Sequence, residues 1–171
     1  MSRKLFAWAL FATVLSAVAV VFPVRADAQR RSAYRVERGN LTGKAFEIFN
    51  QINDRRRRSR LRQLVWNARA AEMAHRYSEE MARERFFGHY DRRGRWVKDR
   101  ARNFGLHGWS GIGENLFLCQ GCGDISSLAV RGWLNSNSHR KNILNPQWTA
   151  TGIGIARDRS GKIYITQVFL R

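Results

Sequence analysis

The C-terminal part of this chain has the pattern of two β-strands, and this pattern restricts the fold more than any other stretch does. Glycine and isoleucine alternate over residues 151–156, and the side chains of residues 163–170 divide into two alternating sets. A period of two is the spacing of a β-strand. Asp158-Arg159-Ser160-Gly161 lies between the two segments and is typical of a turn. The chain is therefore predicted to end in a β-hairpin.

The segments before the hairpin are predicted to be mainly helical. Apolar residues recur at helical spacing, and Asn67 and Asp124 are good N-cap residues for two of the segments. The predicted helices cover residues 42–53, 68–86, 96–104 and 125–134. Asn135–Ser138 is expected to end the last helix, before a basic turn that begins at His139. Helices followed by a hairpin indicate an α+β fold, in which the helices pack on a mostly antiparallel sheet.

The first 28 residues have the composition of a signal peptide. Arg3 and Lys4 precede an apolar run over residues 5–24, and Ala26-Asp27-Ala28 supplies the small residues that a signal peptidase reads. We expect cleavage after Ala28 and export to the periplasm or the extracellular space. The alternative is an uncleaved N-terminal membrane anchor, because the apolar run approaches membrane-spanning length.

The remaining residues are long enough for one domain with a hydrophobic core. Residues 29–41 are polar and basic and have no usable period, so they are predicted to form a flexible linker. Residues 42–171 are then the folded domain.

A large positive charge accompanies this organisation. The net charge is +18, and removal of residues 1–28 takes away three basic residues and one acidic residue, which leaves +16. A field of this size favours anionic partners such as lipid headgroups, acidic cell-wall polymers or nucleic acid. The alternative is a solvated surface that is charged for solubility.

The charge is most concentrated directly after the first predicted helix. Six of eight consecutive positions there are arginines, namely Arg55, Arg56, Arg57, Arg58, Arg60 and Arg62. The run is either a solvated loop between two helices or a patch that docks on an anionic lipid or polymer of the cell envelope. Aromatic residues, on which bases would stack, are absent from the run. Dedicated nucleic-acid binding is therefore not expected.

The two cysteines, Cys119 and Cys122, are separated by two residues. Behind a signal peptide, this spacing favours a small local disulfide. A redox dithiol of the thioredoxin type is less consistent with the surroundings, because no strand is predicted before the first cysteine and no helix begins at it. Metal binding would need further ligands, since two thiolates fall short of the four that structural zinc requires.

Three segments each supply one polar side chain beside glycine or small polar residues: His89, Glu114 and His139. If they converge, they form a site of two imidazoles and one carboxylate. Three protein ligands with an open position are the pattern of catalytic zinc. The alternative is a hydrogen-bonded cluster that ties three loops together. Ser136 lies close to His139 in sequence, but a serine hydrolase is not indicated, because the chain has no Gly-x-Ser-x-Gly elbow.

Taken in order, the motifs of this chain resemble those of the CAP superfamily, also called the SCP-like or cysteine-rich secretory, antigen 5 and pathogenesis-related family, and in particular its bacterial secreted branch. The resemblance runs from about Ala45 to Phe169. It rests on Phe49-Asn50-Gln51-Ile52-Asn53, Leu64-Val65-Trp66-Asn67, Phe87-Gly88-His89-Tyr90-Asp91, Gly113-Glu114-Asn115-Leu116, Ala129–Ser136, Ser138–Leu144, Gly152-Ile153-Gly154 and Tyr164–Gln167.

The resemblance implies a three-layer α-β-α sandwich with a central, mostly antiparallel sheet and a surface cleft. In many eukaryotic members that cleft carries two histidines and two glutamates, and in some it binds a divalent metal such as zinc. His89, Glu114 and His139 match three of these four, Asn115 belongs to the Gly-Glu-Asn motif, and Ser136 stands where the second glutamate is expected.

These observations lead to one functional expectation and one enzymatic alternative, besides a structural or interaction module for which the histidines and the glutamate would be dispensable. The chain is expected to be an exported CAP-domain protein that binds a divalent metal or a small lipid-like ligand and docks on anionic envelope surfaces. The alternative is a metal-dependent hydrolase acting on peptide, lipid or cell wall. With Ser136 in place of the second glutamate, a binding role is favoured over an enzyme.

Overall fold

The computed structural model describes residues 22–171, with side chains from Ala26 onward. Residues up to Tyr34 and residues from Arg35 form separate units. The described elements are α1 (Phe22–Arg58), β1 (Val65–Trp66), α2 (Ala68–Glu84), α3 (Val97–Asn103), β2 (Ile112–Cys119), α4 (Ile125–Asn135), α5 (Asn137–Ile143), β3 (Ala150–Arg157) and β4 (Ile163–Leu170). The expected α+β class is confirmed.

A four-stranded sheet, in the order β1-β3-β4-β2, forms the middle layer of the unit that begins at Arg35. The predicted hairpin is present as β3 and β4, which pair antiparallel, and β2 pairs antiparallel with the other side of β4. Only the short β1 runs parallel to its neighbour. The sheet is therefore mixed but mostly antiparallel.

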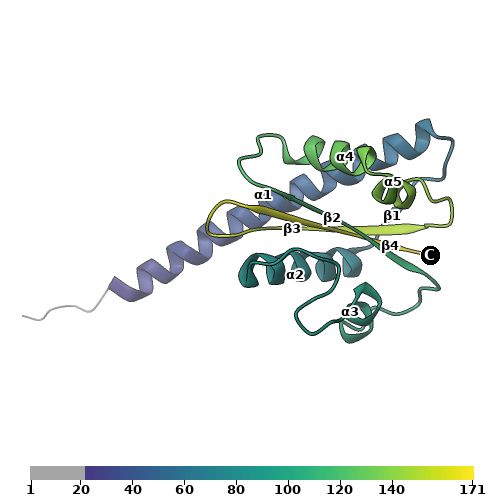
Figure 1. Cartoon of the computed structure of the whole chain (residues 1–171). Coiled ribbons are helices and arrows are strands. Elements are labelled where there is room, and N and C mark those ends of the chain that lie inside the picture. Colours follow the sequence, from purple (N-terminus) through teal and green to yellow (C-terminus); the bar gives the residue numbers. More distant parts are fainter. Residues whose placement is uncertain (1–21) are drawn as a thin grey trace, which may run out of the picture. The chain divides into compact units, whose positions relative to one another are not determined.

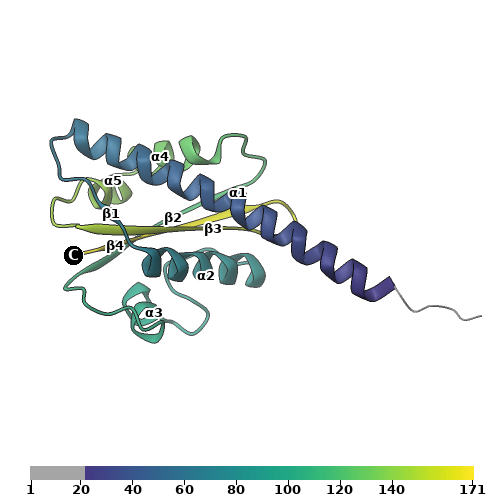
Figure 2. The same ribbon diagram turned by 180° about the vertical axis from the view of Figure 1, so that it is seen from behind.

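Helices cover both faces of this sheet (Figures 1 and 2). On one face, residues 41–58 of α1 pack with α4 and α5 around Ile48, Trp133 and Ile165, none of which is exposed. On the other face, α2 and α3 pack around Ala70, Val97 and other buried residues. This arrangement is the expected three-layer α-β-α sandwich.

Helix α2 approaches the sheet unusually closely. Its N-cap is Asn67, as predicted, whose side chain accepts a hydrogen bond from the Ala70 N–H at 2.9 Å. A Cβ atom added to Gly154 of β3 would lie 1.9 Å from the His75 backbone nitrogen, and one added to Gly152 would meet Ala71 in the same way. The alanine-rich face of α2 and the two glycines of β3 thus let the two backbones meet.

The outer edge of β2 is covered by side chains from the α4–α5 layer. Trp133 Nε1 donates a hydrogen bond to the Leu116 carbonyl at 2.8 Å, and Asn142 Nδ2 donates one to the Glu114 carbonyl at 3.1 Å. Gly111 and Arg171 exchange both of their backbone hydrogen bonds, and in this register the odd-numbered residues of β2 are the ones hydrogen-bonded to β4. The backbone groups of the even-numbered residues of β2 therefore point away from β4.

Several expected boundaries were wrong. The flexible linker predicted over residues 29–41 is helical, because α1 runs without interruption from Phe22. Residues 27–40 are all exposed, so this part of the helix buries nothing and shows no apolar period. The helix predicted to begin at Thr42 is part of α1, and the Thr42 hydroxyl donates to the Arg38 carbonyl one turn earlier at 2.8 Å. Strand β2 and helix α5 were not predicted.

The signal peptide expected over residues 1–28 lies for the most part outside the described residues. Within the described range, no helix is long and apolar enough to span a bilayer.

Substitution of Gly154 by alanine is expected to lower the free energy of unfolding by about 3 kcal/mol, because the new methyl group would have to push α2 away from β3. Urea unfolding measures this change. Gly43→Ala is the matched control, since Gly43 lies in α1 with nothing within 4 Å of an added Cβ. That control should be neutral or stabilising by up to about 1 kcal/mol. Equal destabilisation by the two substitutions would contradict the close approach.

Candidate functional site

His89 and Glu114 lie in direct contact. His89 follows α2 in a loop, whereas Glu114 lies on β2, and His89 Nδ1 is 2.8 Å from Glu114 Oε1. The glutamate side chain is 1% exposed and the histidine side chain is 43% exposed. With Nδ1 held by a buried carboxylate, the other ring nitrogen, Nε2, is the one available to a ligand.

Arg100 of α3 is the cation that permits this burial. Its guanidinium forms an ion pair with Glu114 Oε2, and it also donates hydrogen bonds to the carbonyls of His89 at 2.8 Å and Arg95 at 3.0 Å. The guanidinium carbon lies 3.5 Å from the centre of the Tyr77 ring. Arg100 thus fixes both the carboxylate and the backbone of the histidine that the carboxylate orients.

Sequence reasoning missed Arg100. Nothing in its local sequence separates it from the many other arginines of the chain. The available signal was indirect: a glutamate beside an apolar run was expected to be buried and therefore to need a partner.

The loop that carries His89 is held by Asp91, whose side chain is fully buried. Asp91 accepts hydrogen bonds from the backbone N–H groups of Arg93 and Arg95 and pairs with the Arg95 guanidinium at 2.7 Å. Burial alone would raise the pKa of Asp91, but these hydrogen bonds and the Arg95 charge outweigh it and hold the pKa below its usual value. Asp91 therefore stabilises the loop that carries His89.

His139 comes from α5, in the opposite helical layer. Asn115 Nδ2 donates to the His139 carbonyl at 3.2 Å, and Asn142 Nδ2 donates to Asn115 Oδ1 at 2.9 Å, so α5 is bound to β2 through amides. Burial lowers the pKa of the partly buried His139 ring, and the nearby charge of His89 lowers it further.

Consecutive residues of a strand point to opposite faces, and this explains the arrangement of the site. Glu114 faces Arg100 in the α2–α3 layer, whereas Asn115 faces α5 in the other layer. His89 and His139 therefore belong to different layers and are held to two consecutive residues of β2, which is an edge strand of the sheet.

Ser136 ends α4 and precedes α5, and its hydroxyl lies 3.2 Å from that of Ser138. In the described part of the chain, no hydrogen bond joins either hydroxyl to an imidazole. The expected three-ligand metal set of His89, Glu114 and His139 is also not assembled. Both oxygens of Glu114 are engaged, and no group of three His, Cys, Asp or Glu side chains in residues 22–171 is placed to hold an ion.

The sequence model of the CAP family, described as the cysteine-rich secretory protein family, matches residues 49–169. The chain belongs to the CAP family. The matched residues contain His89, Glu114 and His139 and the whole sheet except Leu170, the last residue of β4.

Relatives of this CAP domain occur in longer proteins. It is 34% identical over 125 residues to the uncharacterized membrane protein YlbC of Bacillus subtilis, covering 73% of this chain and 34% of that protein. It is 31% identical over 124 residues to YkwD of the same organism, covering 72% and 46%.

A crystal structure of an extracellular SCP-domain protein from Bacillus anthracis is also similar. It is 32% identical, with a TM-score of 0.67, over 77% of this chain and 41% of that chain. The chain thus spans less than half the length of each of these three proteins.

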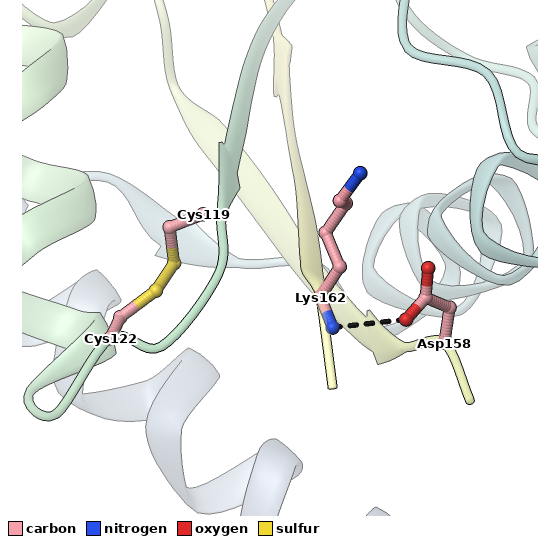
Figure 3. Close-up of a disulfide and its surroundings, with 4 residues drawn as sticks. All are labelled: Cys119, Cys122, Asp158 and Lys162. Atoms are coloured by element: carbon pink, nitrogen blue, oxygen red, sulfur yellow. Dashed lines mark hydrogen bonds between the residues drawn. A yellow bond between two sulfur atoms is a disulfide. The ribbon is translucent and has the colours of Figure 1, made fainter. Parts of the chain in front are cut away.

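The disulfide expected in this CAP domain is present between Cys119 and Cys122 (Figure 3). It joins the end of β2 to the loop before α4. Near it, in the turn between β3 and β4, the Lys162 N–H donates to Asp158 Oδ1 at 2.9 Å. The expectation that no strand leads into Cys119 was wrong, because β2 ends at this residue, but α4 begins only at Ile125.

The arginine run of this CAP domain is not a uniform patch. Arg56 is fully buried and donates hydrogen bonds to the carbonyls of Arg62, Ile143 and Asn145 at 2.7–2.9 Å. It therefore has to be removed from the set expected to dock on anionic material. The other five arginines of the run are exposed.

We expect Arg100→Gln to lower the free energy of unfolding by about 3 kcal/mol, because it leaves the Glu114 carboxylate buried without its cation. The double variant Arg100→Gln/Glu114→Gln removes both charges. It should lose about 2 kcal/mol less than the sum of the two single variants. Urea unfolding of all four proteins gives this coupling energy, and additive effects would contradict a buried ion pair.

Proposed function

We propose that this CAP domain works at the cell envelope, outside the cytoplasm, as a binding module that takes a divalent transition metal such as zinc between His89 and His139. The observation that carries the proposal is the hydrogen bond from His89 Nδ1 to the buried Glu114 carboxylate. A metal-binding histidine commonly gives its second ring nitrogen to a carboxylate in this way, which fixes the ring and its tautomer.

In this proposal Glu114 orients a ligand and is not itself one. Its second oxygen belongs to Arg100, whose positive charge would oppose a metal ion at the carboxylate. The two imidazoles supply two nitrogen ligands, and water or a group from a partner would complete the four positions that zinc prefers. His139 suits this role because its lowered pKa keeps the ring neutral near pH 7.

A metal fits these residues better than a lipid-like ligand does, because the groups that meet are imidazoles and a charged pair rather than apolar side chains. Hydrolysis is less well supported. Within residues 22–171 no serine hydroxyl is hydrogen-bonded to His89 or His139, and the Glu114 carboxylate is engaged by Arg100 instead of being free to accept a proton from water. We therefore propose binding without turnover.

Calorimetric titration of the full-length chain with zinc tests the proposal. Binding is expected in the unaltered protein and in His107→Ala, which changes an exposed loop histidine. It should weaken at least about tenfold in His89→Ala and in His139→Ala, because each removes one of two nitrogen ligands. Equal affinity in the unaltered protein and in the double variant His89→Ala/His139→Ala would refute the metal site.

The titration of His139 gives a separate check. Its pKa lies below the ordinary value of 6.5 in the folded protein, so the unfolded chain binds the proton at higher pH than the folded one does. This contribution to stability is complete above about pH 6.5 and is lost as the pH falls toward the folded pKa. An NMR titration should place the His139 midpoint below the ordinary value of 6.5. A midpoint at or above that value would contradict the described burial.

A further inference from the structure

Two segments that are far apart in sequence form one surface without acidic residues. Residues 55–71 and residues 125–157 contain no aspartate or glutamate. The first segment runs from the last turn of α1 to the first turn of α2, and the second contains α4, α5 and β3. Figures 1 and 2 both show the C-terminal end of α1 beside α5. The two segments thus contribute no acidic residue where the end of α1 meets α5, and Asp54, which directly precedes the first segment, is paired with Arg57.

Arg56 connects the two segments through hydrogen bonds. Its guanidinium donates to the Ile143 carbonyl at 2.7 Å and to the Asn145 carbonyl at 2.9 Å, at the end of α5. Its Nε donates to the Arg62 carbonyl at 2.9 Å, in the loop after α1. A buried arginine that binds three carbonyls holds these two backbone segments in a fixed relation. The exposed cations on either side therefore belong to a preformed surface.

Ten exposed cations lie on the two segments. Arg57 is paired with Asp54 at 2.8 Å and Arg157 with Glu37 at 3.1 Å, whereas the other eight form no ion pair with a carboxylate of residues 22–171. Six of these eight lie close in sequence to Arg56 or to the α5 carbonyls that it binds, and we call them the basic surface: Arg55, Arg58, Arg60, Arg62, Arg140 and Lys141. Unpaired like charges held together repel one another, and an anionic partner would relieve that repulsion.

The basic surface includes a groove. A cavity of about 600 Å³ is lined by residues of α5 and the loop after it. Arg140 and Lys141 supply its cations, and Asn137 and Asn145 supply amides, because the Asn142 amide is engaged by β2; Leu144 and Pro146 complete the lining. Guanidinium and ammonium groups bind phosphate, and amides can bind the hydroxyl or ester oxygens between phosphates. A concave site with both kinds of group suits a chain of alternating phosphate and polar spacer.

We propose that the basic surface binds a linear anionic polymer whose units are joined by phosphodiesters. A lipid bilayer fits less well. Val65 is the only large exposed apolar side chain in the two acid-free segments, so little apolar surface is available for insertion into a bilayer. Nucleic acid fits less well because neither residues 55–62 nor residues 137–146 contain an aromatic side chain for base stacking.

The position of the basic surface connects it with the imidazole site. His139 is followed directly by Arg140 and Lys141 on α5, so a polymer in the groove would lie next to the proposed metal ligands. The inference rests on the envelope location in the proposed function but needs no metal. Polymer binding is therefore measured in the presence of a chelator.

The test uses the full-length chain and a poly(glycerol phosphate) oligomer at several salt concentrations. Affinity should fall linearly with salt on logarithmic axes, since bound counterions are released. Arg140→Gln/Lys141→Gln and Arg58→Gln/Arg62→Gln should each weaken binding about tenfold at low salt and reduce the salt slope by about 1.4, which corresponds to two lost phosphate contacts.

The matched control is Lys98→Gln/Arg102→Gln, which removes the same charge from exposed positions on α3, in the opposite layer. It should leave the affinity within about twofold, because screening limits the reach of distant charges. Equal weakening by the control pair would overturn the inference and leave only a general effect of net charge.

Two further probes separate the sources of phosphate. Phosphatidylglycerol vesicles and a single-stranded oligonucleotide of the same charge should bind more weakly than the polymer does. Tighter binding of either one would overturn the choice of partner. If the unaltered protein binds zinc but not the polymer, this inference alone is overturned. If it binds the polymer but not zinc, the metal site is overturned and the basic surface is retained.

Discussion

The buried ion pair between Arg100 and Glu114 is the interaction on which the site of this CAP domain depends. A carboxylate that is 1% exposed remains charged only where a cation and hydrogen bonds replace the lost water. Arg100 provides that charge from α3, and through the His89 carbonyl it also fixes the loop whose imidazole the carboxylate orients. One guanidinium thus connects a helix, a strand and a loop that the sequence separates.

The pair also decides which chemistry the site can carry. A glutamate with both oxygens engaged is a poor metal ligand and a poor general base, but it is a good support for a neighbouring imidazole. The departure from the four-residue pattern of the family at Ser136 points the same way, because no second carboxylate is present there to replace Glu114.

Sequence reasoning succeeded where a local pattern and the final packing agree. Asn67 caps α2 because its side chain and the following backbone suffice for the cap, and the hairpin of β3 and β4 follows from alternation and a turn. The exposed part of α1 has no apolar face to detect. Helix α5, with only seven residues, depends on its amide contacts with β2 rather than on its own period. Arg56 could not be distinguished from its neighbours, because the carbonyls of Ile143 and Asn145, which are distant in sequence, select it.

The covered edge of β2 has a consequence for how this domain behaves near other molecules. An edge strand with free carbonyls can add a strand from another chain, which leads to aggregation or domain exchange. Here the indole of Trp133 and the amide of Asn142 occupy the outward carbonyls of Leu116 and Glu114. Many copies crowded side by side would therefore have no template for joining their sheets along this part of β2.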